Sequence, residues 1–407
     1  MNNIIKYNTW IAILGFLTLM GLGAWVYQLV NGLGVTAMNN VVSWGLYIIM
    51  FMFFVGLSAG GLIVSSSATV FDIPSYKIVA KPAIILSVVC ITVAGVFILI
   101  DLGGVFRAFN LLIHPQFNSP LMWDVVVITT YMIINIVYLY YMTRKNPPQK
   151  IMKTLSGIAL PIAILVHSVT AWIFGLQIAR TGWHSALMAP LFVASALDSG
   201  LALLLMTLLL MKKFTDYKTE NKLITSLAGL MVTCCIVDAY FVLSEMLTMG
   251  YSGEGADMII FKEMISGSTA PFFWGEVILG FIIPIGILLF RKNREKSGLV
   301  FLSSALIFIG VLCKRIWLLL TSFIHPNVEG APGVTLGRFS QGTYYPDHMS
   351  SMWAIKGTYF PTMLEFIIVI GMLAMGTLIF SILARNILLA SPQKKAMTSQ
   401  EIRPEVG

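Results

Sequence analysis

The stretch 163–200 reads AILVHSVTAWIFGLQIARTGWHSALMAPLFVASALDSG, and it decides the fold class. It holds two apolar runs joined by a short polar connection. Each run continues beyond the stretch until it can span a membrane, which takes about 20 apolar residues in a helix. His167 lies inside the first run and Asp198 inside the second, at similar depth. Ionisable residues at such depth are costly and usually functional, so the stretch predicts both a membrane fold and a site.

The composition supports the membrane class. Of the 407 residues, 57% are hydrophobic and 11% are charged, and the mean hydropathy is +0.86. An average soluble domain is roughly 45–50% apolar and about 25% charged. The net charge of +8 does not indicate a nucleic-acid partner, because basic residues of membrane proteins mark orientation instead.

Ten stretches are long and apolar enough to cross a membrane. The chain is therefore predicted to be an all-α integral membrane protein with about ten transmembrane helices. The predicted spans are 10–30, 43–70, 80–103, 121–142, 155–178, 189–211, 223–249, 270–290, 298–322 and 362–384.

Lysine and arginine residues in the connections predict the orientation. The side that holds both termini carries 19 of them and the opposite side carries 5, while Lys314 and Arg315 lie inside a predicted span. Cytoplasmic loops carry the excess of basic residues. We therefore expect a multi-pass protein of a bacterial inner membrane with both termini in the cytoplasm.

Motifs at similar spacing predict a parallel internal repeat of two four-helix bundles, plus flanking helices. The matching pairs are AGGL (59–62) with DSGL (198–201), Asp101 with Glu245, and SPLMWD (119–124) with APFFWGE (270–276). The predicted parts are a first helix and short outer loop (1–40), a first bundle (41–178), a second bundle (179–322), a long periplasmic loop (323–361), a final helix (362–384) and a cytoplasmic tail (385–407).

The sequence offers no pattern for a metal or haem held by this chain. Its four cysteines all lie in apolar runs and none forms a CxxC motif, which argues against an iron–sulfur cluster or a structural zinc. A transmembrane haem b normally takes two axial histidines, and only His167 lies deep. We therefore expect no metal, haem or cluster in this chain.

The buried acids have two interpretations. They could be paired and hold helices together, as when Arg315 binds Asp238 or Glu245. Alternatively, His167 and Asp198 form a proton-accepting site in an apolar cleft, suited to binding and deprotonating a hydroquinone. Asp238, Glu245 and Glu276 would then be a possible proton path.

Several motifs together resemble the NrfD/PsrC family, the membrane quinone-reactive subunits of polysulfide reductase-like complexes. The similarity covers roughly residues 40–380, and its last motif is similar to the ten-span branch. The motifs are SWGLYIIMFMFFVGLSAGG (43–61), DLGGVFRAFNLLIHPQFNSPLMWD (101–124), HSVTAWIFGLQIARTGWHSALMAPLFVASALDSGLAL (167–203) and YFPTMLEF (359–366).

The resemblance implies residue roles and partners. It implies a quinol site near the periplasmic face, a ferredoxin-like iron–sulfur partner subunit, and commonly a catalytic subunit with molybdopterin or a hydrogenase. His167 and Asp198 would serve the quinone pocket. Its outer wall would hold Asp101, Arg107, Trp123 and Asp124, with Trp44 and Tyr47 as weaker candidates. Trp183 and His184 would lie in the loop that faces the iron–sulfur partner.

The expected function is therefore that of a membrane anchor and quinol-reactive subunit. It would exchange electrons between menaquinol in the membrane lipid and the iron–sulfur partner during anaerobic respiration, and it would not be active alone. Quinone is an exchangeable substrate in this interpretation. The alternative is a secondary transporter or a proton-translocating subunit, because ten spans, a parallel repeat and buried acids also occur in transporters.

Reporter fusions test the predicted orientation. A reporter that works only outside the cytoplasm should be active at Glu329, and a cytoplasmic reporter should be active at the C-terminus, because 19 of the basic residues lie on the side of the termini. A cytoplasmic reporter that is active at Glu329 would contradict the orientation.

Overall fold

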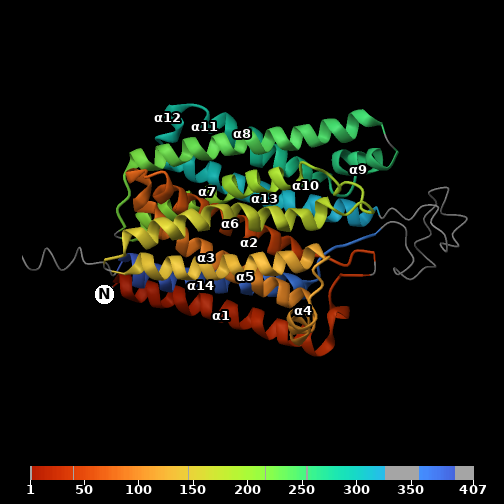
Figure 1. Cartoon of the computed structure of the whole chain (residues 1–407), viewed down its shortest axis with the longest axis horizontal. Helices are drawn as coiled ribbons and strands as arrows, with labels where there is room; N and C mark the ends of the chain where they lie inside the picture. Colours follow the sequence, from red (N-terminus) through yellow and green to blue (C-terminus); the bar gives the residue numbers. More distant parts are fainter. Residues whose placement is uncertain are drawn as a thin grey trace, which may run out of the picture.

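The structure is a computed structural model that describes residues 2–39, 41–144, 146–215, 217–253, 255–325 and 357–389. Within these ranges the chain is helical and contains no strand. Ten helical segments of this part are long and apolar enough to cross a membrane, and they run roughly along one common axis (Figure 1). The predicted all-α fold with ten spans is confirmed.

Nine spans consist mainly of one long α-helix each, and the last of them, Met363–Leu389, ends in the π-helical segment η7 (Ala384–Leu389). They are α1 (Asn2–Asn31), α2 (Leu46–Val70), α3 (Lys77–Asp101), α5 (Pro120–Thr143), α6 (Gln149–Gly175), α7 (Met188–Phe214), α8 (Asn221–Ser252), α13 (Ser297–Ile324) and α14 (Met363–Leu383). Short helices α4 (Ala108–Ile113), α9 (Gly255–Ser266) and α12 (Arg291–Arg294) lie in the connections. We call the end of the bundle that holds α4 and α9 the outer end, after its predicted orientation.

The remaining span, Ala270–Leu288, is interrupted. It consists of α10 (Ala270–Gly275), a π-helical segment η4 (Glu276–Ile282) and α11 (Ile283–Leu288). Pro284 has no N–H group to donate to the carbonyl of Gly280, one turn earlier. The Cys235 thiol of α8 donates to that carbonyl instead, at 3.3 Å. Such π segments are frequent at functional sites, and this one begins with the buried Glu276.

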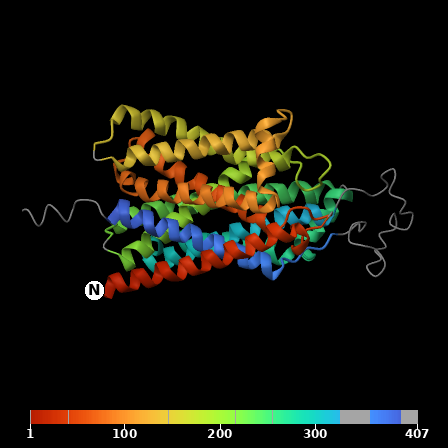
Figure 2. The same ribbon diagram turned by 90° about the horizontal axis from the view of Figure 1, so that it is seen from below.

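Helix α2 is the central helix of the molecule. It packs against α3, α6, α7 and α13, and most of its side chains are buried. This explains why its sequence is apolar on all faces. Helices α1 and α14 pair with each other along one edge of the bundle in both views (Figures 1 and 2).

Glycines allow two close helix crossings. A Cβ atom on Gly60 of α2 would lie 2.7 Å from the Cα atom of Gly200 in α7. A Cβ atom on Gly21 of α1 would lie 2.5 Å from the Cα atom of Gly371 in α14. Small residues permit such approaches between membrane helices. Gly60 and Gly200 belong to the AGGL and DSGL motifs, and a contact between equivalent helices is what a twofold repeat would produce.

The repeat and the division into six parts remain predictions. The helix contacts are compatible with them: α2 packs on α3 and α6, and α5 on α6, while α7 packs on α8 and α13, and η4 packs on α13. Residues 326–356, with Glu329 and most of the predicted periplasmic loop, lie outside the described residues. The tail from residue 390 onward does so as well.

The crossing of α2 and α7 should be sensitive to one methyl group. Gly60→Ala forces the two backbones apart, and overpacking typically costs about 1–3 kcal/mol. The melting temperature of the detergent-solubilised chain should fall by several degrees. Gly157→Ala in α6 is the matched control, because a Cβ atom there meets nothing within 4 Å. Equal melting temperatures for Gly60→Ala and wild type would contradict the close packing.

Candidate functional site

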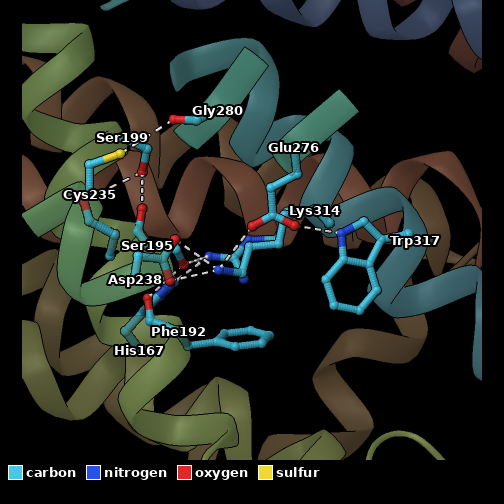
Figure 3. A network of polar contacts seen from close by, with 12 residues as sticks. His167, Phe192, Ser195, Ser199, Cys235, Asp238, Glu276, Gly280, Lys314 and Trp317 are labelled. Carbon is cyan, nitrogen blue, oxygen red and sulfur yellow. Dashed lines mark hydrogen bonds and ion pairs between the residues drawn. The ribbon is translucent and has the colours of Figure 1, made fainter. Parts of the chain in front are cut away.

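Ionisable side chains from five helical elements meet inside the bundle and are completely buried (Figure 3). We call them the charged cluster. Its members are His167 of α6, Asp198 of α7, Asp238 of α8, Glu276 of η4, and the neighbours Lys314 and Arg315 of α13. Buried charges are tolerated when they are paired or hydrogen-bonded, so their contacts decide what the cluster can do.

Lys314 is the centre of the acidic half of the cluster. Its ammonium group lies 2.7 and 2.8 Å from the two carboxylate oxygens of Asp238 and 3.3 Å from Oε1 of Glu276. The indole N–H of Trp317 donates to the other oxygen of Glu276 at 2.6 Å. The pairing interpretation gave Arg315 as the partner of Asp238. In the structure that partner is Lys314.

Arg315 points in a different direction from Lys314, because consecutive residues of a helix are about 100° apart. Its Nη2 donates to the Ser195 hydroxyl at 2.6 Å and lies 3.3 Å from Nε2 of His167. The guanidinium lies over the ring of Phe192, 4.2 Å from the centroid. A guanidinium only donates hydrogen bonds. The Nε2 atom of His167 must therefore accept, which places the proton of a neutral His167 on Nδ1.

Asp198 lacks the partners that the other acids have. Neither of its oxygens, nor the Nδ1 of His167, has a hydrogen-bond partner among the described residues. Asp198 interacts electrostatically with Asp238 and Lys314. A hydrogen bond between the carboxyl groups of Asp198 and Asp238 would require one of them to be protonated. No hydrogen bond in the described part of the chain joins His167 to Asp198, so they belong to one cluster without direct contact.

The cluster does not balance its own charge. With a neutral histidine, it contains two cations and three carboxyl groups. If all three carboxyl groups are ionised, the net charge is −1, and one added proton makes the cluster neutral. Charge imbalance is costly in an apolar interior. The arrangement is therefore suited to holding one proton and releasing it.

Tyr47 and Asp101 lie in a second polar group, near the outer ends of α1, α2, α3 and α14. The Tyr47 hydroxyl donates to Oε1 of Gln28 at 2.6 Å. Asp101 interacts electrostatically with the buried Glu365, and its Oδ1 has no partner among the described residues. Glu365 accepts a hydrogen bond from the Tyr359 hydroxyl at 2.6 Å. Burial and this carboxylate raise the pKa of Tyr359, so its hydroxyl keeps its proton.

Three further predicted residues lie apart from both groups. Asp124 is buried and accepts a hydrogen bond from the Thr170 hydroxyl at 2.7 Å. Trp123 is 49% exposed and donates to the carbonyl of Phe117. Arg107 is exposed at the outer end. The contacts therefore do not bring these residues into the charged cluster.

Trp44 and Trp183 belong to an aromatic cluster between the outer end and the charged cluster. Their rings stack with centroids 6.4 Å apart, and Phe174 contacts both of them and also Phe192. Trp183 is only 3% exposed. His184 is exposed, and its Nδ1 lies 2.9 Å from the carbonyl of Gly175. That this loop faces a partner subunit stays a prediction.

Comparison with known proteins agrees with this architecture. The family model described as "Polysulphide reductase, NrfD" matches residues 34–327. The chain belongs to the NrfD family.

Relatives of this NrfD-family chain include membrane subunits of redox complexes. A putative dimethyl sulfoxide reductase membrane subunit from Halobacterium salinarum is 35% identical, over 91% of this chain and 88% of the relative. The Hdr-like menaquinol oxidoreductase integral membrane subunit of Archaeoglobus fulgidus is 31% identical, over 92% of each chain. A menaquinone reductase integral membrane subunit of Nitratidesulfovibrio vulgaris is 24% identical, over 76% of this chain and 80% of the relative.

The sequence interpretation of this NrfD-family chain missed the central role of Lys314. Two adjacent basic residues inside a predicted span were the available signal, but a sequence does not show which helix each one faces. Glu245 also differs from expectation, because it accepts a hydrogen bond from Ser185 at 2.8 Å instead of binding Arg315. Among the described residues, no group of three or more His, Cys, Asp or Glu residues is arranged to hold a metal ion.

Removing the Lys314 charge should prevent normal folding. Lys314→Met leaves Asp238 and Glu276 buried without their cation, and breaking a buried ion pair typically costs about 3–5 kcal/mol. Gel filtration of detergent extracts should show little folded chain, and the double variant Lys314→Met with Asp238→Asn should restore part of it. Lys77→Met, in an exposed pair with Asp72, is the control and should change little. Wild-type amounts of Lys314→Met would contradict the ion-pair assignment.

Proposed function

We propose that this chain is the quinone-reactive membrane subunit of a multi-subunit respiratory oxidoreductase. It exchanges electrons between menaquinol in the membrane and a ferredoxin-like iron–sulfur subunit on the periplasmic side. A catalytic subunit with molybdopterin, or a hydrogenase, completes the complex. The names of two relatives, a menaquinol oxidoreductase subunit and a menaquinone reductase subunit, support this proposal.

The charge imbalance of the charged cluster carries the proposal. Oxidation of a hydroquinone releases two electrons and two protons. A cluster that differs from neutrality by one proton, in an otherwise apolar interior, offers a place for such a proton. Asp198 is the proton acceptor in this proposal, because among the described residues its oxygens have no hydrogen-bond partner and another carboxyl group is nearby. His167 shares the role in this proposal, because it belongs to the same buried cluster.

The depth of the cluster fits proton release to the outer side. At ~1.5 Å of rise per residue, His167 lies about 12 Å below the outer end of α6, and Asp198 lies about 15 Å below the start of α7. Both positions are in the outer half of the bundle.

Asp238, Glu276 and Glu245 would form the path by which protons leave. Glu276 is bonded to Trp317, and Trp317 lines a small cavity of about 20 Å³ that Glu245 also lines. A cavity of that volume has room for one water molecule. A water there would lie beside Glu245, which is the outermost acid of the proposed path.

The remaining predicted residues have outer positions in this proposal. Tyr47 and Asp101 lie together in the polar group at the outer end, and Asp124 lies between α5 and α6. Arg107 and Trp123 are at the surface of the outer end. Trp44 and Trp183 separate the charged cluster from the outer solution, and His184 lies in the loop proposed to face the iron–sulfur partner. Both termini are cytoplasmic in this orientation, and the membrane is the cytoplasmic membrane.

Two variants test the proton-acceptor role. Asp198→Asn and His167→Phe should each slow menaquinol-linked turnover of the assembled complex by at least ~10²-fold, the usual effect of removing a positioned acid–base group. Turnover with an artificial dye that donates electrons to the partner subunits should be unchanged. Both rates are measured on the same preparation.

Thr207→Val is the matched control for these variants, because Thr207 is buried on α7 but lies outside the charged cluster. It should leave both rates near the wild-type values. Menaquinol turnover within twofold of wild type in Asp198→Asn and His167→Phe would contradict the proton-acceptor role. A wild-type complex without any menaquinol-dependent turnover would contradict the proposed function and favour a transporter.

A further inference from the structure

An apolar groove lies on the surface of the bundle beside the charged cluster. It is formed by α6, α7 and α8 and has a volume of about 540 Å³, which is in the range of small-molecule sites. Its lining includes half-exposed apolar side chains, among them Ile164 and Val237. Because all three helices are membrane spans, the groove opens toward lipid.

The groove and the charged cluster are neighbours on every helix that forms the groove. Residues that line the groove directly precede or follow buried residues of the interior in the sequence, so the same helical turns contribute to both. The adjacent pairs are Ser168 with His167, Ala194 with Ser195, Leu197 with Asp198, Cys234 with Cys235, and Val237 with Asp238.

An electrostatic interaction also indicates that the groove is close to the charged cluster. Cys234 lines the groove and interacts electrostatically with both Asp198 and Asp238. The groove is therefore an apolar surface open to lipid whose inner wall adjoins two buried carboxyl groups. A ligand that matches both surfaces has a long hydrocarbon tail and a head group with a hydroxyl that can donate to a carboxylate.

We propose that the α6–α7–α8 groove binds the isoprenoid tail of the quinol and guides its head group toward Asp198. This inference rests on the proposed function and adds the place of binding. The tail lies against the apolar lining of α7, and the head group passes between α7 and a neighbouring helix. Asp198, whose oxygens have no partner among the described residues, accepts a hydrogen bond from the quinol hydroxyl.

Filling the groove tests the proposal with a closely matched control. Val237 and its neighbour Ile236 are both 43% exposed on α8, but only Val237 lines the groove. Val237→Trp should raise the KM for long-tailed menaquinol at least tenfold and leave dye-linked turnover unchanged. Ile236→Trp should leave both within twofold. Equal KM values for the two variants would overturn the proposal, because the groove would then hold ordinary lipid.

A labelling experiment on the wild-type complex does not depend on the variants folding. A menaquinone analogue with a photoreactive diazirine in its tail is illuminated in proteoliposomes, and the adducts are located by mass spectrometry. Adducts should fall within 164–168, 189–197 or 233–241 and disappear with excess menaquinone but not with excess phospholipid. Adducts confined to other helices would overturn the groove assignment even when menaquinol turnover is intact. A loss of that turnover in wild type would instead contradict the proposed function.

Discussion

Two adjacent cations buried inside the membrane bundle determine which side chains must surround them. Lys314 and Arg315 are fully buried on α13, and each must find partners without water. Lys314 obtains two carboxylates, one from α8 and one from the π segment of the interrupted span. Arg315 obtains a hydroxyl, a histidine and an aromatic face. Gly56 of α2 leaves space beside His167 and Arg315, where a Cβ atom would lie 3.3 Å from the imidazole.

Among the described residues, this division of partners leaves Asp198 without a cation of its own, and that is the link to function. A fully paired cluster would only join helices. Here the net charge of the cluster depends on one proton, because of the third carboxyl group. That group interacts electrostatically with another carboxyl group and lies on a helix that also lines the groove open to lipid. The same residues that hold α6, α7, α8 and α13 together are therefore suited to proton exchange with a membrane-soluble substrate.

The sequence was sufficient for the spans, because about 20 apolar residues in a row have few alternatives to a transmembrane helix. It was also sufficient to single out His167 and Asp198 as deeply buried. It could not show that Lys314 faces Asp238 while Arg315 faces His167, since that depends on the rotation of α13 against its neighbours. Nor could it show that Tyr47 and Asp101 join Gln28 and Glu365 in a separate group, which takes long-range packing of α1 and α14.

Infrared difference spectroscopy of the assembled complex, recorded as menaquinol is oxidised, can detect proton transfer to Asp198. Transfer of a proton to a buried carboxylate produces a new carbonyl stretching band of a protonated carboxyl group. We expect this band to appear in wild type, to shift in heavy water, and to be absent in Asp198→Asn. The same band with unchanged intensity in Asp198→Asn would show that another group receives the proton and that Asp198 is not the acceptor.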